Sequence, residues 1–370
     1  MNPAAARPWM QRALQLASLG RGATSPNPMV GALVLDQQGH LVGEGFHARA
    51  GEPHAEVGAL AQAGDRARGG TLVVTLEPCC HHGRTPPCCE TVIEAGIARV
   101  IVAMRDPNPL VAGGGLQRLR QAGLEVIEGV AETEARQLNR AFVHRVTTGR
   151  PLGILKWAMS VDGRTALPDG DSQWISGPAA RTWVHQLRAG CDAVIVGGGT
   201  LRSDDPLLTS RGRRRPEPLR VVVSRRAELP RQAQLWDTRP APTLVAHGRS
   251  ATPETLAWLD RLGAEQGVER LALDACEPRE LLQALAERGC NRVLWECGPE
   301  LAAAALRQDC VQELAAVIAP KLLGGVPART PTGDLGLTKV AAAALWRDRG
   351  TLRLDADLVW LLEAAAIPWA

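Results

Sequence analysis

The sequence predicts an α/β protein of two domains, residues 1–149 and 150–370. Its 370 residues exceed one ordinary domain and are enough for each half to bury its own core. In both halves short runs rich in Val, Ile and Leu alternate with amphipathic stretches, which is typical of strands alternating with helices. A polar stretch with glycine and proline, 147–151, separates them. We therefore expect one α/β sheet covered on both faces by helices, followed by a second α/β unit.

The amino-acid composition argues against some classes of binding partner. Apolar residues make up 45% of the chain, charged residues 22%, and the net charge is +3, which is too small to favour a nucleic-acid or membrane partner. Nine cysteines, with no secretory leader and no regular spacing, favour a reducing compartment. No apolar run reaches the roughly 18 residues of a transmembrane helix. We expect a cytoplasmic, homo-oligomeric protein that acts on small molecules, although the sequence does not give the number of subunits.

In the first half, prolines, glycines and apolar runs mark the elements in order. An amphipathic helix over 1–22 precedes a rigid turn at 24–28, where two prolines exclude helix. Two strands joined by a turn at 36–40 then read as a hairpin. The predicted strands are 30–35, 41–47, 72–76, 99–103 and 124–127, and the predicted helices are 54–63, 88–98, 116–122 and 133–146.

The second half continues the alternation. Its strands are rich in β-branched residues, and a proline stands at or near the start of several helices. The predicted strands are 152–158, 193–196, 219–224, 243–247, 271–273, 292–295 and 313–319, and the predicted helices are 178–189, 253–262, 278–288 and 299–308.

One stretch of the first half carries the residues of a catalytic zinc site. His54 is followed two residues later by Glu56, and Cys79 and Cys88 each follow a proline. Zinc held by three such ligands keeps an open position and can lower the pKa of bound water from about 15.7 toward 7. Glu56 is then placed to carry protons. This order of residues is the signature of zinc-dependent nucleobase deaminases, with eight residues between the cysteines instead of two.

Neighbouring side chains leave alternatives open within this site. Cys80 and Cys89 adjoin the proposed ligands, and His81 or His82 could bind a metal in principle. The preceding prolines favour the proposed pair of cysteines, because adjacent residues on a strand or helix point elsewhere. We interpret Cys80 and Cys89 as packing thiols, and His81, His82 and Arg84 as candidates for substrate contact.

A glycine run in the second half, 197–200, follows a predicted strand and raises the question of a dinucleotide site. The pattern G-x-G-x-x-G fails, because its sixth position is Arg202. A tight turn is one interpretation. Another is that the small residues allow a close approach of the backbone to a pyrophosphate.

The motifs of the first half closely resemble the amino-terminal half of the bifunctional riboflavin-biosynthesis deaminase-reductases. That family begins with a cytidine-deaminase-like α/β/α domain, and the resemblance implies that His54, Cys79 and Cys88 bind zinc and that Glu56 is the proton shuttle. A departure is Gly58, where the family often carries a second histidine that is not a ligand. The motifs are Ser25–Gly31, Gly51–Glu56, Thr75–Cys79, His81–Cys88 and Asp106–Pro109.

The same resemblance implies substrate contacts in the first half. Asn27, Asp106 and Asn108 are expected to touch the pyrimidine or ribityl portion of the substrate, and Arg84 its phosphate.

The second half resembles the reductase half of this family, which is similar to dihydrofolate reductase and uses NADPH to reduce a ribosyl group to ribityl. The motifs are Lys156–Thr165, Ser172–Ser176, Leu187–Arg188, Gly199–Thr200, Asp204–Pro206, Trp295–Pro299 and Ala319–Gly324. The resemblance implies that NADPH is held by Ala158, Trp174, Thr200, Asp204, Gly298, Pro299, Glu300, Leu301, Ala302, Ala303 and Ala304, and the substrate by Ser172, Arg188, Leu208, Arg211 and Glu296.

Physical chemistry supports part of this assignment. A phosphorylated sugar requires paired guanidinium donors, which Arg188 and Arg211 could supply. The arginine run 211–215 is most simply a solvated loop, and a contact with the 2′-phosphate of NADPH is the weaker alternative. Ser224 and Arg225 depart from the Asp-Ser pair of the family, so they are given no role.

Three functions are compatible with these patterns. The leading hypothesis is a bifunctional enzyme, a zinc-dependent hydrolase that deaminates a phosphoribosylamino-pyrimidine and an NADPH-dependent oxidoreductase that reduces its ribose. The alternative is a deaminase of nucleosides or RNA bases fused to an unrelated reductase, which should show basic surface and stacking aromatics; the charge of +3 and the lack of Tyr argue against it. The third is a regulatory module with a structural zinc, which usually has a fourth protein ligand.

Overall fold

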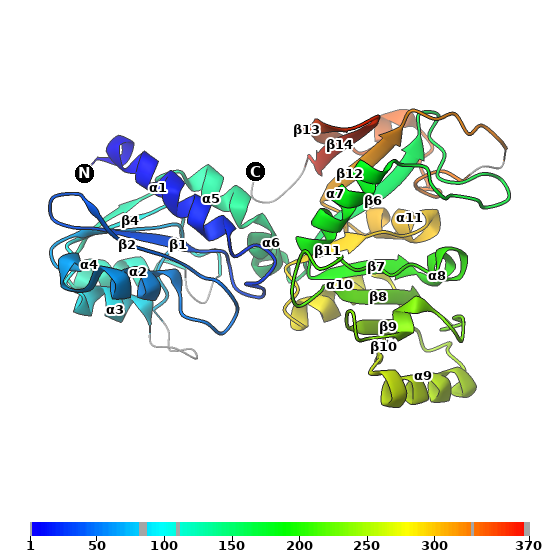
Figure 1. The fold of residues 1–370 in the computed structure, drawn as a ribbon, viewed down its shortest axis with the longest axis horizontal. Helices are drawn as coiled ribbons and strands as arrows, with labels where there is room; N and C mark the ends of the chain where they lie inside the picture. Colours follow the sequence, from blue (N-terminus) through cyan, green and yellow to red (C-terminus); the bar gives the residue numbers. More distant parts are fainter. Residues whose placement is uncertain (1, 81–86, 109–111, 327–328, 366–370) are drawn as a thin grey trace. The chain divides into compact units, whose positions relative to one another are not determined.

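The computed structural model describes residues 2–80, 87–108, 112–326 and 329–365. The chain forms two compact units, one reaching Thr148 and one beginning at Gly149 (Figure 1). Each unit is built on a sheet of its own, and strands alternate with helices along most of the chain. The predicted α/β class is confirmed.

The first unit contains a mixed five-stranded sheet in the order β2-β1-β3-β4-β5. Strand β1 is antiparallel to both of its neighbours, whereas β3, β4 and β5 are parallel. Its strands are β1 Gly31–Leu35, β2 Leu41–Phe46, β3 Thr71–Val74, β4 Arg99–Val102 and β5 Glu125–Glu128, and its helices are α1 Pro3–Ser18, α2 Ala55–Ala63, η1 Gly64–Ala67, α3 Cys88–Glu94, α4 Gly114–Gln121, α5 Glu132–Leu138 and α6 Arg140–Thr148.

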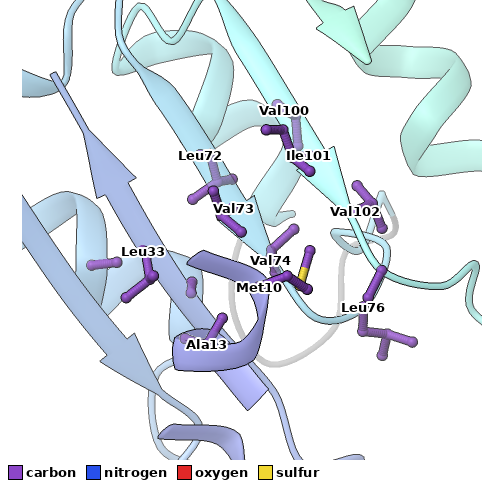
Figure 2. Packing of buried hydrophobic residues seen from close by; sticks show 14 of the residues in the cluster. Met10, Ala13, Leu33, Leu72, Val73, Val74, Leu76, Val100, Ile101 and Val102 are labelled. Carbon is purple, nitrogen blue, oxygen red and sulfur yellow. The ribbon is translucent and has the colours of Figure 1, made fainter. Parts of the chain in front are cut away.

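Helices cover both faces of this sheet, with α1 and α5 on one face and α2, α3 and α4 on the other (Figure 1). The central strands are buried on both faces, as their continuous apolar runs predict. Figure 2 shows Met10 and Ala13 of α1 packing with residues of β3 and β4, among them Val74 and Val102. The core of the first unit therefore includes β3, the strand that precedes the predicted zinc ligand Cys79.

One predicted helix is wrong in this unit. The stretch 133–146 forms two helices, α5 and α6, which are separated at Asn139. The amide of Asn139 is buried and makes two hydrogen bonds of 2.8 Å with the backbone N–H and carbonyl of Met29. This contact with a distant segment outweighs the local helical pattern, which the sequence alone could not show.

Glycines allow α2 to lie directly on the edge of the sheet. A Cβ atom at Gly43 of β2 would lie 2.1 Å from the carbonyl oxygen of Ala59, and one at Gly45 would lie 2.3 Å from that of Ala55. Side chains at these positions would push the helix away from the strand. Because α2 begins directly after His54, this close packing sets the position of one predicted zinc ligand.

The second unit contains a nine-stranded sheet in the order β10-β9-β8-β7-β11-β6-β12-β14-β13. The first seven strands in this order are parallel, and β14 and β13 continue the sheet in antiparallel fashion. Its strands are β6 Leu152–Ser160, β7 Ala193–Gly197, β8 Leu219–Ser224, β9 Thr243–His247, β10 Glu269–Ala272, β11 Arg292–Trp295, β12 Glu313–Ala319, β13 Trp346–Leu354 and β14 Asp357–Ala364, and its helices are α7 Pro178–Ala189, α8 Gly198–Asp204, η2 Gln234–Trp236, α9 Pro253–Gln266, α10 Pro278–Glu287, α11 Pro299–Arg307 and η3 Val340–Ala342.

Both faces of this sheet are also covered. Leu314 of β12 belongs to a core formed with α10 and α11. Val317 of the same strand packs with Ala180 of α7 and Val359 of β14. Since residues an odd number of positions apart on a strand point to opposite faces, α7 lies on the face opposite to α10 and α11.

The hairpin of β13 and β14 is absent from the sequence-based prediction. Strand β13 is an edge strand whose residues are mostly exposed, so it lacks the apolar alternation that marks a half-buried strand. Strand β14 pairs with β12 along six residues, and Asp357 accepts a hydrogen bond of 2.7 Å from the backbone N–H of Gly177. These distant contacts define the hairpin.

Among the described residues, no helix is both long and apolar enough to cross a membrane.

The close contact between α2 and β2 can be tested with one substitution on each side. Gly45→Ala places a methyl group against a carbonyl oxygen, so we expect the free energy of unfolding of the first unit to fall by about 1–3 kcal/mol. The matched control is Gly58→Ala on the facing helix, where the nearest atom would be 3.8 Å away. We expect this change to stabilise the unit by up to about 1 kcal/mol. Calorimetric unfolding would measure both, and equal stability of Gly45→Ala and the wild type would contradict the packing.

Candidate active sites

The three predicted zinc ligands come together from three segments. His54 precedes α2, Cys79 lies beyond the carboxyl end of β3, and Cys88 is the first residue of α3. His54 Nδ1 lies 3.2 Å from Cys88 Sγ and 3.7 Å from Cys79 Sγ, and the three donor atoms all lie within 4.8 Å of one another. The structure thus assembles the donor set that the sequence pattern predicts.

These distances fit a zinc ion. Zinc–sulfur bonds of about 2.3 Å and a zinc–nitrogen bond of about 2.1 Å in a tetrahedron place nitrogen and sulfur roughly 3.6 Å apart. In the part of the chain that the structure describes, this is the one group of three or more such donors. His81 and His82, the alternative ligands, lie outside the described residues, as does Arg84.

The environment of the two thiols favours a thiolate. The pKa of Cys79 is lowered to about 4, first because Cys88 donates a hydrogen bond to it and then because His54 lies beside it. The backbone N–H of Cys88, at the start of α3, also donates to Cys79 Sγ at 3.3 Å, as expected for an anion at a helix N-terminus. Sharing its proton with Cys79 raises the pKa of Cys88, so metal binding must displace that proton.

Glu56 lies in the first turn of α2 and is 3% exposed. Burial raises the pKa of its carboxyl group. A carboxyl group in such surroundings exchanges its proton nearer to neutral pH than an exposed glutamate does. The carboxyl group also interacts with His54 and Cys79 electrostatically and with Cys88 through a hydrogen bond, so Glu56 lies beside the predicted zinc ligands, where a proton carrier is required.

The thiols adjacent to the ligands occupy different surroundings. Cys89 is fully buried, and its Sγ donates to the carbonyl oxygens of Pro78 at 3.3 Å and Gly115 at 3.6 Å. Burial raises the pKa of this thiol, which keeps it protonated. Cys80 is partly buried against the core of the unit. Both positions agree with the interpretation of packing thiols.

Asn27 lies close to the metal centre through His47. Its Nδ2 atom is 3.1 Å from His47 Nε2, and His47 Nδ1 is 3.2 Å from the carbonyl oxygen of Pro53. The His47 ring also meets that of His54 edge to face at 5.4 Å. If the carbonyl accepts the Nδ1 proton, Nε2 accepts from the Asn27 amide. Sequence reasoning missed His47, which stands outside every recognised motif.

Glu77 is a second residue whose role was missed. It is buried, and its two carboxylate oxygens accept four backbone N–H groups of the segment that follows β4. The donors are Asp106 at 3.1 Å, Gly113 at 3.0 Å, Gly115 at 2.9 Å and Leu116 at 3.2 Å. Asp106 in turn accepts a bond of 2.8 Å from the backbone N–H of Asn108. Glu77 therefore fixes two predicted substrate contacts, and a glutamate at the end of an apolar strand was the available signal.

In the second unit, the predicted residues gather where parallel strands end. Strands β6, β7, β8, β11 and β12 run in the same direction, so their carboxyl ends share one edge of the sheet. Ligands of α/β proteins commonly bind at this edge. Ala158 lies near the end of β6, and Glu296 follows β11 directly.

Arg188 and Glu296 form a buried ion pair. Arg188 Nε and Nη2 donate to the two carboxylate oxygens of Glu296 at 2.5 and 3.0 Å, and Nη1 donates to the carbonyl oxygen of Thr209 at 3.1 Å. Burial alone would raise the pKa of Glu296, but Arg188 holds it below its ordinary value. All three nitrogen atoms of the Arg188 guanidinium thus donate hydrogen bonds within the protein.

Lys156 of β6 lies near this pair and was given no role from the sequence. Burial lowers its pKa, which the charge of Glu296 partly offsets. A lysine within an apolar strand is the signal that could have identified it.

The glycine run 197–200 is a junction between a strand and a helix. Strand β7 ends at Gly197 and α8 begins at Gly198, so the interpretation as a tight turn is wrong. A Cβ at Gly298 would lie 3.8 Å from Thr200 Oγ1. The two segments predicted to hold NADPH, around Thr200 and around Gly298–Ala304, therefore adjoin each other.

Trp174, Asp204 and Ser172 are further residues predicted to bind NADPH or the substrate. Trp174 is 61% exposed, the Arg181 guanidinium stacks 4.6 Å from its ring centre, and its carbonyl oxygen accepts from Lys321 Nζ at 2.5 Å. Asp204 is the exposed last residue of α8, and Ser172 lies in the segment before α7. Within the described residues, no hydrogen bond connects Ser172 or Asp204 to the Arg188 and Glu296 pair.

The arginine run 211–215 is only partly a solvated loop. Arg211 and Arg213 are exposed, but Arg214 turns inward and forms a mostly buried ion pair of 3.2 Å with Asp192. Its guanidinium also donates to the carbonyl oxygen of Cys191. Leu208, a predicted substrate contact, has a side chain that is only 2% exposed.

Comparisons with known proteins match both halves of the chain. The family model for the cytidine and deoxycytidylate deaminase zinc-binding region matches residues 4–104, and the model for the RibD C-terminal domain matches residues 151–360. The riboflavin biosynthesis protein RibD of Synechocystis is 51% identical over 334 residues, covering 90% of this chain and 89% of the relative. RibD of Escherichia coli is 43% identical over 373 residues, covering 96% and 99%.

Solved structures show the same similarity over the whole length. RibD of Acinetobacter baumannii aligns with a TM-score of 0.88 and 38% identity, covering 99% of this chain and 100% of that one. A diaminohydroxyphosphoribosylaminopyrimidine deaminase/5-amino-6-(5-phosphoribosylamino)uracil reductase from Thermotoga maritima aligns with a TM-score of 0.85 and 34% identity, covering 98% and 99%. The chain therefore belongs to the RibD family of bifunctional riboflavin biosynthesis proteins.

Proposed function

We propose that this chain catalyses two successive steps of riboflavin biosynthesis. The first is the hydrolytic deamination of 2,5-diamino-6-(5-phosphoribosylamino)pyrimidin-4-one. The second is the NADPH-dependent reduction of the ribosyl group of 5-amino-6-(5-phosphoribosylamino)uracil to ribityl. The name of the Thermotoga maritima relative states both activities. The observation that carries the proposal is the convergence of His54, Cys79 and Cys88 beside the buried Glu56.

In the deaminase unit, different residues are proposed for metal binding and for proton transfer. Zinc bound there would supply an activated water at neutral pH. His54, Cys79 and Cys88 would hold the metal. Glu56 would take one proton from the attacking water and give it to the ring nitrogen, and would then take the second proton from the resulting hydroxyl group and give it to the amine as the carbon–nitrogen bond breaks. Within the described residues, three donors face the site, which favours a catalytic zinc over a structural zinc closed by four protein ligands.

The segment bound by Glu77 carries two of the proposed substrate contacts of this unit. Asp106 and Asn108 are held by the hydrogen bonds described above, and Asn27 approaches the metal from the segment before β1. These three side chains are proposed to hold the pyrimidine or ribityl portion of the substrate. Arg84 is proposed for the phosphate, and its role rests on the family resemblance.

In the second unit, NADPH supplies the hydride, so the protein has to bind and orient the cofactor and the sugar. The segments around Thr200 and Gly298–Ala304 adjoin each other and are proposed to hold NADPH together with Ala158, Trp174 and Asp204. Glu296 orients Arg188, which is proposed to bind the substrate together with Ser172, Leu208 and Arg211.

A homo-oligomeric assembly and a cytoplasmic location remain predictions from the sequence. Size-exclusion chromatography with light scattering would determine the number of subunits.

The proposed pair of reactions can be tested in one assay. The purified, zinc-loaded chain is incubated with the diamino-pyrimidine ribosyl phosphate, and ammonia release and NADPH oxidation are followed in parallel. We expect ammonia first and NADPH oxidation after it. No ammonia would refute the deaminase assignment, and ammonia without NADPH oxidation would refute the reductase assignment.

Substitutions at the zinc site should affect metal binding and proton transfer separately. Cys79→Ser and Cys88→Ser should each lose the bound zinc, which is about one ion per chain, together with deamination. Glu56→Gln should keep the zinc but lower the deamination rate by at least ~100-fold, because a general acid–base group is lost. Metal analysis by mass spectrometry and the ammonia assay give the two readings. Full zinc content in either cysteine variant would overturn the ligand assignment.

The buried ion pair predicts that lysine cannot replace Arg188. One ammonium group cannot bind both oxygens of Glu296 and the Thr209 carbonyl, so Arg188→Lys should raise the KM of the reductase substrate by roughly tenfold or more. Deamination should be unchanged. The matched control is Arg288→Lys, which alters an exposed pair with Glu269 and should leave both activities near the wild type. A wild-type KM for Arg188→Lys would contradict the assignment.

A further inference from the structure

The loop between α8 and β8 contains an unusual backbone over residues 207–212. Leu208 and Arg211 have φ angles of +55° and +54°, although neither is glycine. Residues with a Cβ atom adopt this left-handed region at a cost, so the surrounding structure must hold them there. The question is which side chains hold this loop, because it carries two predicted contacts to the reductase substrate.

Three charged side chains bind the backbone of the loop. Arg188 donates to the carbonyl oxygen of Thr209 at 3.1 Å, and Arg220 donates to that of Leu207 at 3.4 Å. Glu217 accepts from the backbone N–H groups of Ser210 at 2.6 Å and Gly212 at 2.8 Å. Arg188 has a predicted role and Arg220 binds mainly other segments, whereas Glu217 has no role assigned so far.

The two bonds of Glu217 lie on either side of Arg211. Oε2 accepts from the residue before Arg211, and Oε1 accepts from the residue after it. One carboxylate therefore fixes the Thr209–Ser210 peptide group and the Arg211–Gly212 peptide group, which bracket Arg211. In the described part of the chain, no ion pair joins Glu217 to the Arg211 guanidinium. The positive charge of Arg211 thus stays available for an anionic ligand.

Arg211 and Arg188 lie around a common neighbour. The pKa of His185 on α7 is lowered, first by burial and then by the positive charges of Arg188, Arg211 and Arg213. Arg188 Nη1 also donates to the carbonyl oxygen of Thr209, two residues before Arg211, at 3.1 Å, so Arg188 lies directly against the loop that bears Arg211. This is the arrangement that a phosphorylated sugar would require.

We propose that Glu217 is a positioning residue of the reductase site, which fixes the backbone around Arg211 so that this guanidinium stands with Arg188 to bind the phosphorylated sugar. The proposal rests on the reductase function proposed above. Glu217 itself does not touch the substrate and acts through Arg211.

The test compares Glu217→Ala and Glu217→Gln with the wild type. The amide of Gln offers one acceptor oxygen, so it can satisfy only one of the two N–H groups and should show an intermediate effect. We expect the substrate KM and the Kd of ribose 5-phosphate, measured by calorimetry, to rise by roughly tenfold in Glu217→Ala, as loss of a charged hydrogen-bonding group predicts. The KM of NADPH, the zinc content and the deamination rate should stay within about twofold, since these sites are unchanged.

The matched control removes a charge elsewhere in the same unit. Glu265 is an exposed residue of α9, and Glu265→Gln should leave all these constants unchanged. Hydrogen exchange should be faster at the amides of residues 208–213 in Glu217→Ala and unaltered in the control.

A double-mutant cycle with Arg211→Ala separates positioning from general support of the fold. If Glu217 acts through Arg211, Glu217→Ala should weaken ribose 5-phosphate binding little further in the Arg211→Ala background. Additive losses would overturn the proposal, as would unchanged binding in Glu217→Ala. A parallel rise in the KM of NADPH with a lower Tm would assign Glu217 a merely structural role and also overturn it. A wild-type chain that binds ribose 5-phosphate but oxidises no NADPH would instead refute the reductase function, and the binding comparison would still decide the role of Glu217.

Discussion

The structure of the first unit must bring the donor atoms of three separate segments together at one point. His54, Cys79 and Cys88 belong to different elements, so small shifts of those elements would separate the donors by more than a metal allows. Two contacts prevent this. Helix α2 lies on β2 without intervening side chains at Gly43 and Gly45. The buried carboxylate of Glu77 binds the segment after β4 to the turn that bears Cys79.

The need to keep the zinc ligands together also explains the glycine at position 115, in the segment bound by Glu77. A Cβ at Gly115 would lie 2.1 Å from the carbonyl oxygen of Pro78 and 3.2 Å from Cys89 Sγ. The segment bound by Glu77 therefore packs directly against the residues next to the predicted metal ligands. If Asp106 or Asn108 holds the substrate as proposed, these short contacts would fix its position relative to the predicted zinc ligands, and such preorganisation favours reaction over mere binding.

The sequence predicted best those features that depend on short segments. The zinc ligands were predictable because His, Glu and two Cys residues in this order are typical of one kind of metal site. Most strands were predictable because they are buried on both faces and therefore have continuous apolar runs. Features set by distant contacts were not predictable. Asn139 interrupts a helical pattern because it binds Met29, and β13 is an edge strand with little apolar pattern. Glu77 and Glu217 act on backbone N–H groups, which every residue type except proline possesses, so no sequence motif reveals their partners.

The second unit shows why its charged residues resisted assignment from sequence. Arg220 is fully buried in β8 and donates to carbonyl oxygens of Leu235, Asp237 and Ala241 at 3.1, 2.7 and 2.7 Å. Burial lowers its pKa to about 10, still far enough above neutral pH for the guanidinium to remain charged. All three bonds come from Nη2, and Nη1 donates to the carbonyl oxygen of Leu207 at 3.4 Å. Arginine therefore serves here to brace loops, while Arg211 stays exposed on a loop whose backbone is fixed by other side chains. Burial therefore distinguishes Arg220, whose guanidinium binds carbonyl groups of the protein, from Arg211, whose exposed guanidinium has the proposed binding role.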